Sequence, residues 1–287
     1  FKQASSIVLL ISITRPLMTT TLLNTDQQDF LWIFVGDEGD NELIDLSGFV
    51  YFEGRGGNDL FDQFTALDEG DEADEDNRAF VLGGQGDDLL TSSLGQDTID
   101  GGEGDDFIDG KDGNDQLTGG SGKDRIFGRN GRDLLDGGPG HDFLIGGKST
   151  DYLIGGSGKD VLKAGAGNDL LQGGDGNDIL DAGSGDDFVD GGGGKDTLIG
   201  GTGDDVFVIS PGRSVVKDYD LGELIQYDEG TFGSGYSIEQ SGEDLVISMR
   251  NFIASITLLQ ISKSDFDASE LIQPIRIDDE NLELVAE

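Results

Sequence analysis

Residues 83–208 divide without a gap into fourteen blocks of nine residues, and this period constrains the fold more than any other feature of the chain. The sixth residue is Asp in all fourteen blocks, the eighth is always a large apolar residue, and the fourth is Gly in thirteen, with Ser149 as the exception. A short period with fixed chemistry at each position indicates a solenoid, in which each repeat packs on its neighbours.

Each fixed position of the block has a structural reason. Glycine at the early positions permits the positive φ angles and close backbone approach of a tight turn, at no steric cost. The last three positions form a short strand, in which position 8 points to one side and positions 7 and 9 point to the other. Position 8 therefore faces a core.

One block makes half a coil, because a short strand and a turn reverse the chain direction once. Two blocks make a coil of eighteen residues, so the fourteen blocks make seven coils. At a strand spacing of ~4.8 Å these coils would form a body roughly 34 Å long, with two parallel sheets around a thin core. We therefore predict an all-β fold, a right-handed parallel β-roll with two nonapeptides per coil.

The aspartates at position 6 predict metal sites in the turns. Blocks n and n+2 share an edge, so fourteen blocks offer about twelve slots between coils, each bracketed by two aspartates and by turn carbonyls. Such all-oxygen surroundings select Ca²⁺ over zinc, copper or magnesium. An Asx turn would explain one aspartate beside a glycine, but not fourteen in one phase. The predicted calcium ligands here are Asp88, Asp97, Asp106, Asp115, Asp124, Asp133, Asp142, Asp151, Asp160, Asp169, Asp178, Asp187, Asp196 and Asp205.

The composition agrees with a chain that needs cations in order to fold. There are 59 acidic residues against 18 Lys and Arg, for a net charge of −41, and 49 glycines, which without metal indicate disorder. Twelve calcium ions would bring the charge to about −17 and remove much of the self-repulsion. The same charge argues against nucleic acids and anionic membranes as partners, and the lack of cysteine excludes disulfides and thiolate zinc sites.

The blocks follow the pattern G-G-x-G-x-D-x-U-x, where U is a large apolar residue. In this they resemble the haemolysin-type calcium-binding repeats of the RTX proteins, over 126 of the 287 residues. The resemblance implies a parallel β-roll in which the position-6 aspartates and glycine-turn carbonyls bind calcium between coils. It also implies export by a type I secretion system and folding outside the cell.

Two degenerate blocks, 36–44 and 54–62, precede the array and predict an N-terminal cap over residues 36–62. Asn41 replaces the aspartate in the first, while the second keeps Asp59, which we add to the predicted calcium ligands. Residues 63–82 form an acidic insertion, whose segment 68–76 predicts a solvated loop, and Phe80–Leu82 predict a strand.

Residues 1–35 are harder to interpret, and Met18 is a credible native start. The apolar run from Ile7 to Ile13 is too short to span a bilayer and lacks the cleavage site of a signal peptide. No other segment predicts a transmembrane span.

Residues 209–287 lose the repeat motif, and we expect the nine-residue phase to end at Val208, followed by a β-rich cap. The segment 215–225 resembles one that follows the last repeat in many RTX proteins, but Tyr219 and Leu224 depart from that pattern. We therefore expect no firm calcium ligand among Asp218, Asp220 and Glu223. The final acidic, amphipathic residues predict an uncleaved C-terminal secretion signal.

No catalytic site is predicted, so we expect that the chain is not an enzyme. In GGSGKD, which occurs twice, and in GGGGKD, the lysine is followed by Asp rather than Ser or Thr, so none of these segments fits a phosphate-binding loop. No G-x-S-x-G elbow occurs. His141, the single histidine, falls at the variable position 5, where a solvent-facing turn residue is expected.

Two further expectations concern the roll itself. Ser149 must adopt a turn geometry that other blocks assign to glycine, so the slots beside block 146–154 should be the weakest. Apolar residues at the outward positions 7 and 9 reflect either strand propensity or a docking face for the terminal segments or another β-roll. They are Phe107, Phe127, Phe143, Ile145, Tyr152, Ile154 and Phe188.

The sequence therefore predicts a secreted protein that folds on binding calcium and has a structural, adhesive or surface-associated role. Its partners would be calcium ions and, through the outward aromatic positions, another copy or a surface polysaccharide. One alternative is the calcium-binding export and folding module of a larger secreted protease, lipase or polysaccharide-modifying enzyme. Another is a matrix component in which calcium bridges molecules.

Overall fold

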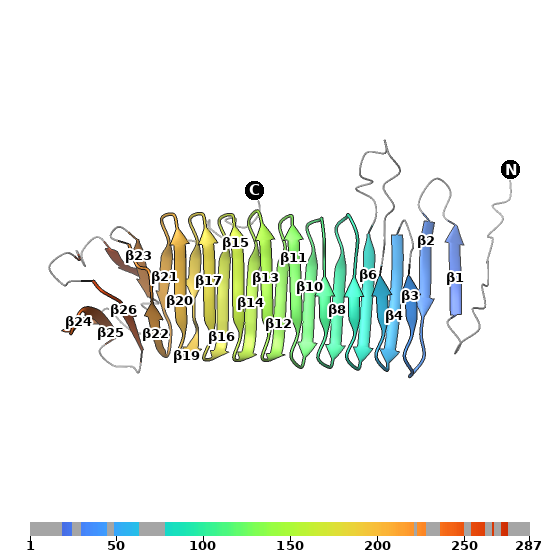
Figure 1. The fold of residues 1–287 in the computed structure, drawn as a ribbon, viewed down its shortest axis with the longest axis horizontal. Coiled ribbons are helices and arrows are strands. Elements are labelled where there is room, and N and C mark those ends of the chain that lie inside the picture. The colour runs from blue at the N-terminus through green and yellow to red at the C-terminus, as the bar shows by residue number, and fades with distance from the viewer. Residues whose placement is uncertain are drawn as a thin grey trace.

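The computed structural model describes residues 19–24, 30–44, 49–62, 78–220, 223–227, 236–249, 254–261, 266 and 271–274. They form a long flattened stack of coils, with the N-terminal strands at one end and the last strands of the described chain at the other (Figure 1). The predicted acidic loop at 68–76, the residues before Met18 and the predicted secretion signal after Pro274 lie outside the described residues.

Two sheets make up the stack, and consecutive strands of the roll alternate between them. Sheet A has the order β1 (Thr19–Asn24), β2 (Phe30–Val35), β4 (Phe49–Gly56), β6 (Ala79–Gln85), β8 (Thr98–Glu103), β10 (Gln116–Ser121), β12 (Leu134–Gly140), β14 (Tyr152–Gly158), β16 (Leu170–Gly176), β18 (Phe188–Asp190), β21 (Val206–Ile209), β23 (Leu224–Tyr227) and β27 (Ile272–Pro274), and β19 (Gly193–Gly194) pairs with β16. Sheet B has the order β24 (Tyr236–Ser241), β25 (Asp244–Met249), β26 (Ser255–Leu258), β22 (Arg213–Val216), β20 (Thr197–Thr202), β17 (Ile179–Ser184), β15 (Val161–Ala166), β13 (Phe143–Lys148), β11 (Arg125–Asn130), β9 (Phe107–Asp109), β7 (Leu89–Thr91), β5 (Leu60–Asp62) and β3 (Glu42–Ile44).

The strand register repeats every eighteen residues along the array. Leu117 on β10 pairs with Ile99 on β8 and Leu135 on β12, and Leu144 on β13 pairs with Ile126 and Leu162 in the other sheet. All of these pairs are parallel, and the antiparallel pairs lie at the ends, between β1 and β2 and in the β24–β25–β26 meander. The predicted all-β, two-sheet parallel β-roll with a β-rich C-terminal cap is confirmed.

The core is a single layer of position-8 side chains between the two sheets. Every one of the fourteen is at most 1% exposed, as the period-two alternation predicts. They are Leu90, Ile99, Ile108, Leu117, Ile126, Leu135, Leu144, Leu153, Leu162, Leu171, Leu180, Val189, Leu198 and Phe207.

The coils extend past both ends of the repeat motif. Val216 pairs with Leu198 and Ile225 pairs with Phe207, so residues 209–226 keep the eighteen-residue register. Our expectation that the phase ends at Val208 is therefore wrong for the backbone. The physical reason is that 209–217 and 218–226 retain an apolar residue, Val216 and Ile225, at the inward position, and both are fully buried.

The same continuation occurs upstream, where the stretch between the two degenerate blocks carries no motif. Phe52 on β4 and Val81 on β6 are fully buried in the core layer, and Phe52 pairs with Val81 in parallel register. The predicted strand at Phe80–Leu82 lies within β6. In the described part of the chain, no helix is both long and apolar enough to cross a membrane.

Candidate metal sites in the turns

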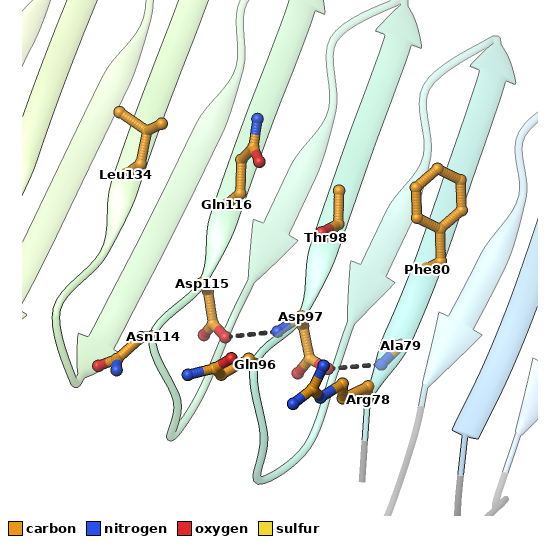
Figure 2. Close-up of a pocket in the computed structure, with 10 residues that line it drawn as sticks. All are labelled: Arg78, Ala79, Phe80, Gln96, Asp97, Thr98, Asn114, Asp115, Gln116 and Leu134. Carbon is orange, nitrogen blue, oxygen red and sulfur yellow. Dashed lines mark hydrogen bonds between the residues drawn. The ribbon is translucent and has the colours of Figure 1, made fainter. Parts of the chain in front are cut away.

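The position-6 aspartates form a ladder along each edge of the roll. The backbone N–H of Asp97 donates to Oδ1 of Asp115 at 2.9 Å, and the N–H of Ala79 donates to Oδ1 of Asp97 at 2.6 Å (Figure 2). The same bond recurs from coil to coil along both edges, for example from Asp88 to Asp106 and from Asp187 to Asp205. Oδ1 of each ladder aspartate therefore accepts a hydrogen bond from a backbone N–H of the preceding coil.

The second carboxylate oxygen, Oδ2, is buried without a hydrogen-bond partner in almost every rung. Asp196 departs from this pattern, because the Ser214 hydroxyl donates to its Oδ2 at 3.3 Å. Buried polar atoms in folded proteins are normally satisfied, and an unpaired buried carboxylate oxygen is costly. The atoms concerned are Oδ2 of Asp59, Asp88, Asp97, Asp106, Asp115, Asp124, Asp133, Asp142, Asp151, Asp160, Asp169, Asp178, Asp187 and Asp205.

Backbone carbonyl oxygens lie beside these Oδ2 atoms. A Cβ placed on Gly83, at position 1 of its block, would collide with Oδ2 of Asp88 and with the carbonyl oxygen of Gly101, one coil further on. Glycine therefore keeps space at this position for a carboxylate and a carbonyl to approach each other. Three of the fourteen blocks carry a side chain at position 1, namely Ser92, Ala164 and Ala182.

Burial raises the pKa of the ladder carboxyls above their ordinary value of 3.8. The pKa of Asp88 rises to about 7 and that of Asp151 to about 8, and neighbouring aspartates on the ladder add to the effect of desolvation. Asp115 reaches about 9, because it is deeply buried and lies near Asp97 and Asp133. Because these buried carboxylates lie close to one another, their negative charge is unfavourable, and the row favours the binding of either protons or cations.

The donor set fits a hard divalent cation. Among the described residues, no three acidic or histidine side chains gather closely enough to hold a metal ion by themselves. A cation at a turn would therefore combine ladder carboxylates with backbone carbonyls, a mixture of oxygen ligands that suits Ca²⁺, with its large and flexible coordination shell.

Ser149 occupies a position-4 site where the other thirteen blocks have glycine. Its φ is 75°, in the left-handed region that costs energy for a residue with a Cβ. Gly158, at position 4 of the next block, has a φ of 148°. The turn of block 146–154 thus differs in backbone geometry from its neighbour, and the weaker calcium slots expected beside this block stay a prediction.

Asn41 shows what an amide does in the place of a ladder aspartate. Its side-chain Nδ2 donates to Oδ1 of Asp59 at 2.9 Å and to the carbonyl oxygens of Gly39 and Gly54. The amide thereby bonds to oxygens that a cation would need, and the weakened site expected in this block stays a prediction.

A second ladder, at position 5, was missed by the sequence analysis, which treats this position as variable and solvated. The backbone N–H of Asp105 donates to the Asp87 carboxylate, and that of Lys159 donates to Nδ1 of His141, both from one coil to the next. The exposed acceptors are Asp40, Asn58, Asp87, Asp105, Asn114, His141, Asn168, Asn177 and Asp186. The sequence does indicate this ladder, because Asp, Asn and His, whose short side chains can accept a hydrogen bond, recur at position 5.

Glu223 occupies position 6 of the last coil, where the sequence analysis expected no firm ligand. It is 4% exposed, and burial together with Asp205, Asp218 and Asp220 raises its pKa to about 8. The Asp218 carboxylate accepts hydrogen bonds from the N–H groups of Gly200 and Gly201, at 3.1 and 2.9 Å. The signal that could have found Glu223 was the continued nine-residue count past Val208.

Coils of eighteen residues with a buried carboxylate at position 6 of each block define a β-roll repeat protein. The sequence profile of the RTX calcium-binding nonapeptide repeat matches residues 35–62, 82–117, 118–153, 154–189 and 172–207. These matches cover more than half of the chain, which therefore belongs to the RTX calcium-binding repeat family.

Two solved structures are similar to parts of this chain. The extracellular lipase LipA from Serratia marcescens is similar over 68% of this chain and 40% of its own, at 19% identity and a TM-score of 0.36. A subunit of the mannuronan C5-epimerase from Azotobacter vinelandii is similar over 44% of this chain and 78% of its own, at 23% identity and a TM-score of 0.23. The similarity covers less than half of the length of the lipase. A comparison with curated protein sequences found no match.

Proposed function

We propose that this chain is a secreted calcium-binding protein whose β-roll folds as Ca²⁺ binds between the coils, with a structural, adhesive or surface-associated role. One observation carries the proposal: the row of buried ladder carboxylates in which Oδ2 has no hydrogen-bond partner. Like charges stacked at one-coil intervals repel, so the folded roll needs cations at these positions.

The proposed ligands are the ladder aspartates, from Asp59 and then from Asp88 to Asp205, together with turn carbonyls. The fourteen blocks offer up to about twelve such sites. Because the ligands are brought together only in the coiled chain, binding and folding are one event. At the ~0.1–1 mM affinities of extracellular calcium modules, the roll would fold outside the cell.

We also propose that the chain has no catalytic activity of its own and leaves the cell through a type I system by an uncleaved C-terminal signal. Family membership supports the calcium-binding part of this proposal. The acidic, amphipathic character of the last seventeen residues supports the secretion signal.

The full chain tests this proposal by circular dichroism. In EDTA we expect a weak β-sheet signal, and titration with calcium should restore it cooperatively, while magnesium at the same concentration should have much less effect. A chain with the same β-sheet signal in EDTA and in calcium would overturn the proposal.

A further inference from the structure

The two outer faces of the roll carry opposite charge. Between β8 and β18, the strands of sheet A hold five acidic side chains and no Lys or Arg. These are Asp100, Glu103, Asp136, Asp175 and Asp190. Between β9 and β17, the strands of sheet B hold four cations against two acids. These are Arg125, Arg129, Lys148 and Lys163 against Asp109 and Asp181.

One of the two acids on sheet B is already neutralised. Asp109 is buried and accepts from Lys111 Nζ at 3.0 Å and from Arg129 at 3.1 Å. The Arg125 guanidinium lies over the Phe143 ring, 5.8 Å from its centroid. Within the described residues, no ion pair is found for Arg125 or Lys163, so their charge is directed to the surface.

Each face also carries an apolar row at position 7. On sheet A, Leu134, Tyr152, Leu170, Phe188 and Val206 line an open groove of about 610 Å³ that crosses five successive coils. Its lining also includes one cation, Arg132, and the ladder aspartates Asp115, Asp133, Asp151, Asp169 and Asp187. A pocket of about 460 Å³ continues the row toward the N-terminus, where Phe80, Thr98 and Gln116 project from neighbouring strands (Figure 2).

On sheet B the corresponding row, which we call the ridge, has exposed apolar residues at its two ends. It runs Leu89, Phe107, Arg125, Phe143, Val161 and Ile179. Leu89 and Ile179 are 43% and 45% exposed. Sheet A therefore offers a largely apolar groove with mainly acidic surroundings, and sheet B offers a ridge of apolar side chains and Arg125 with cationic surroundings.

We propose that a second copy of this chain lays the ridge of its sheet B into the groove of sheet A. The contact joins two different faces, so a pair of copies keeps one free face of each kind, one on either copy, and the assembly grows as an open stack. This inference rests on the proposed function, because both faces exist only in the folded, calcium-bound roll.

Charge and period favour a second copy over other partners. The opposite charges on the two faces attract each other at close range. Both molecules are acidic overall, but at physiological ionic strength, where the Debye length is ~8 Å, the repulsion between their net charges is screened. Both rows repeat once per coil, at the same ~4.8 Å spacing, so their side chains stay in register along the contact. An acidic polysaccharide would need the face of sheet B alone and would leave the groove of sheet A without a role.

The size of the contact sets its strength. Six strands of about six residues cover ~20 Å by ~29 Å, or roughly 580 Å² per copy. The total, about 1,200 Å², is at the low end of specific interfaces, so a single pair should be weak and the stack should depend on protein concentration.

Sedimentation velocity of the full chain, in calcium sufficient to fold it, tests the proposal through a charge swap. Variant one carries Arg125→Glu and Lys163→Glu on sheet B, and variant two carries Asp136→Lys and Asp175→Lys on sheet A. We expect the native chain to associate as its concentration rises and each variant alone to stay monomeric. The mixture of both variants should associate, because every contact in it is again between opposite charges.

A control variant, Lys123→Glu with Lys195→Glu, makes the same change in net charge at the turn edge and should associate as the native chain does. The circular dichroism titration of each variant separates the two proposals: a chain that does not fold with calcium contradicts the proposed function. Native protein that folds and remains monomeric at high concentration, or a mixture of variants that remains monomeric, overturns this inference. Monomeric protein that binds a soluble polyuronate through Arg125 and Lys163 would also overturn it, in favour of a polysaccharide partner.

Discussion

Asp97 and Asp115 are joined across one coil, because the Asp97 N–H donates to Oδ1 of Asp115 at 2.9 Å, while Oδ2 of both carboxylates stays buried without a partner. One oxygen of each aspartate thus belongs to the backbone ladder and the other is available for a cation. The two roles should respond differently to substitution, since an amide retains the first and removes the second.

Asp142→Asn should remove calcium from the two slots beside it. The asparagine keeps an Oδ1 that accepts from the Asp124 N–H, but its amide would donate to neighbouring oxygens, as Asn41 does. We expect bound calcium to fall by about two ions per chain and the calcium midpoint of folding to rise about tenfold, equivalent to about 1.4 kcal/mol.

Equilibrium dialysis with radioactive calcium measures this loss, and circular dichroism gives the midpoint. Asp181→Asn is the matched control, since that carboxylate lies on the outer face of β17 and should leave both quantities unchanged. Equal losses in the two variants would show that net charge, rather than the ladder, determines binding.

Ser149→Gly should strengthen calcium binding. Ser149 holds a φ of 75°, and glycine removes the left-handed strain of about 1 kcal/mol, so the calcium midpoint should fall by roughly fivefold. The measurement is a calcium titration by circular dichroism, with Ser157→Gly, at a variable position of the next block, as the control. An unchanged midpoint would contradict the view that this turn is the weak point of the array.

In the absence of metal, the roll should be more stable in mild acid than in base. The folded-state pKa of Asp88 is about 7 and that of Asp115 about 9, both above the ordinary value of 3.8. The folded chain therefore binds protons more tightly than the unfolded chain, and this stability is full below about pH 4 and lost as the pH rises through the folded values.

Circular dichroism in EDTA tests this pH dependence. We expect more β-sheet at about pH 5.5 than at about pH 9, and the reverse order for calcium affinity, because bound protons compete with the metal. A metal-free chain whose β-sheet content grows with pH would contradict the burial of the ladder carboxyls.

The sequence predicts the features that each nonapeptide repeats within itself. Leu117 faces the core and Asp115 lies in a turn because both follow from position within one block, and the same inference holds fourteen times. Features that depend on contact between coils cannot be inferred from the positions within one block. The bond from Lys159 N–H to His141 joins residues eighteen apart, and position 5 holds several residue types that share only a short acceptor.

The end of the roll was missed for a related reason. The repeat motif was taken to mark the coils, but the coils need only an apolar residue at every ninth position, which Val216 and Ile225 provide. Loss of glycine and aspartate ends the motif without ending the register, so Glu223 enters position 6 with a side chain that the pattern does not contain.

Glu223→Gln tests whether that position works as a rung of the array. Glu223 is buried beside Asp205, whose Oδ2 has no partner, and its Oε2 accepts from the Asp220 N–H at 2.8 Å. If this pair brackets a calcium ion, the substitution should lower bound calcium by about one ion. In calcium, backbone hydrogen exchange should then become faster in β22 and β23, with the central coils unaffected, because the last coil loses its cation.

Glu239→Gln, on the exposed strand β24, is the matched control and should leave both quantities as they are. Hydrogen exchange followed by mass spectrometry resolves the two regions of the roll. If Glu223→Gln leaves bound calcium and exchange in β22 and β23 as in the native chain, the cation sites end with Asp205 and the last coil is held by Val216, Ile225 and the cap alone.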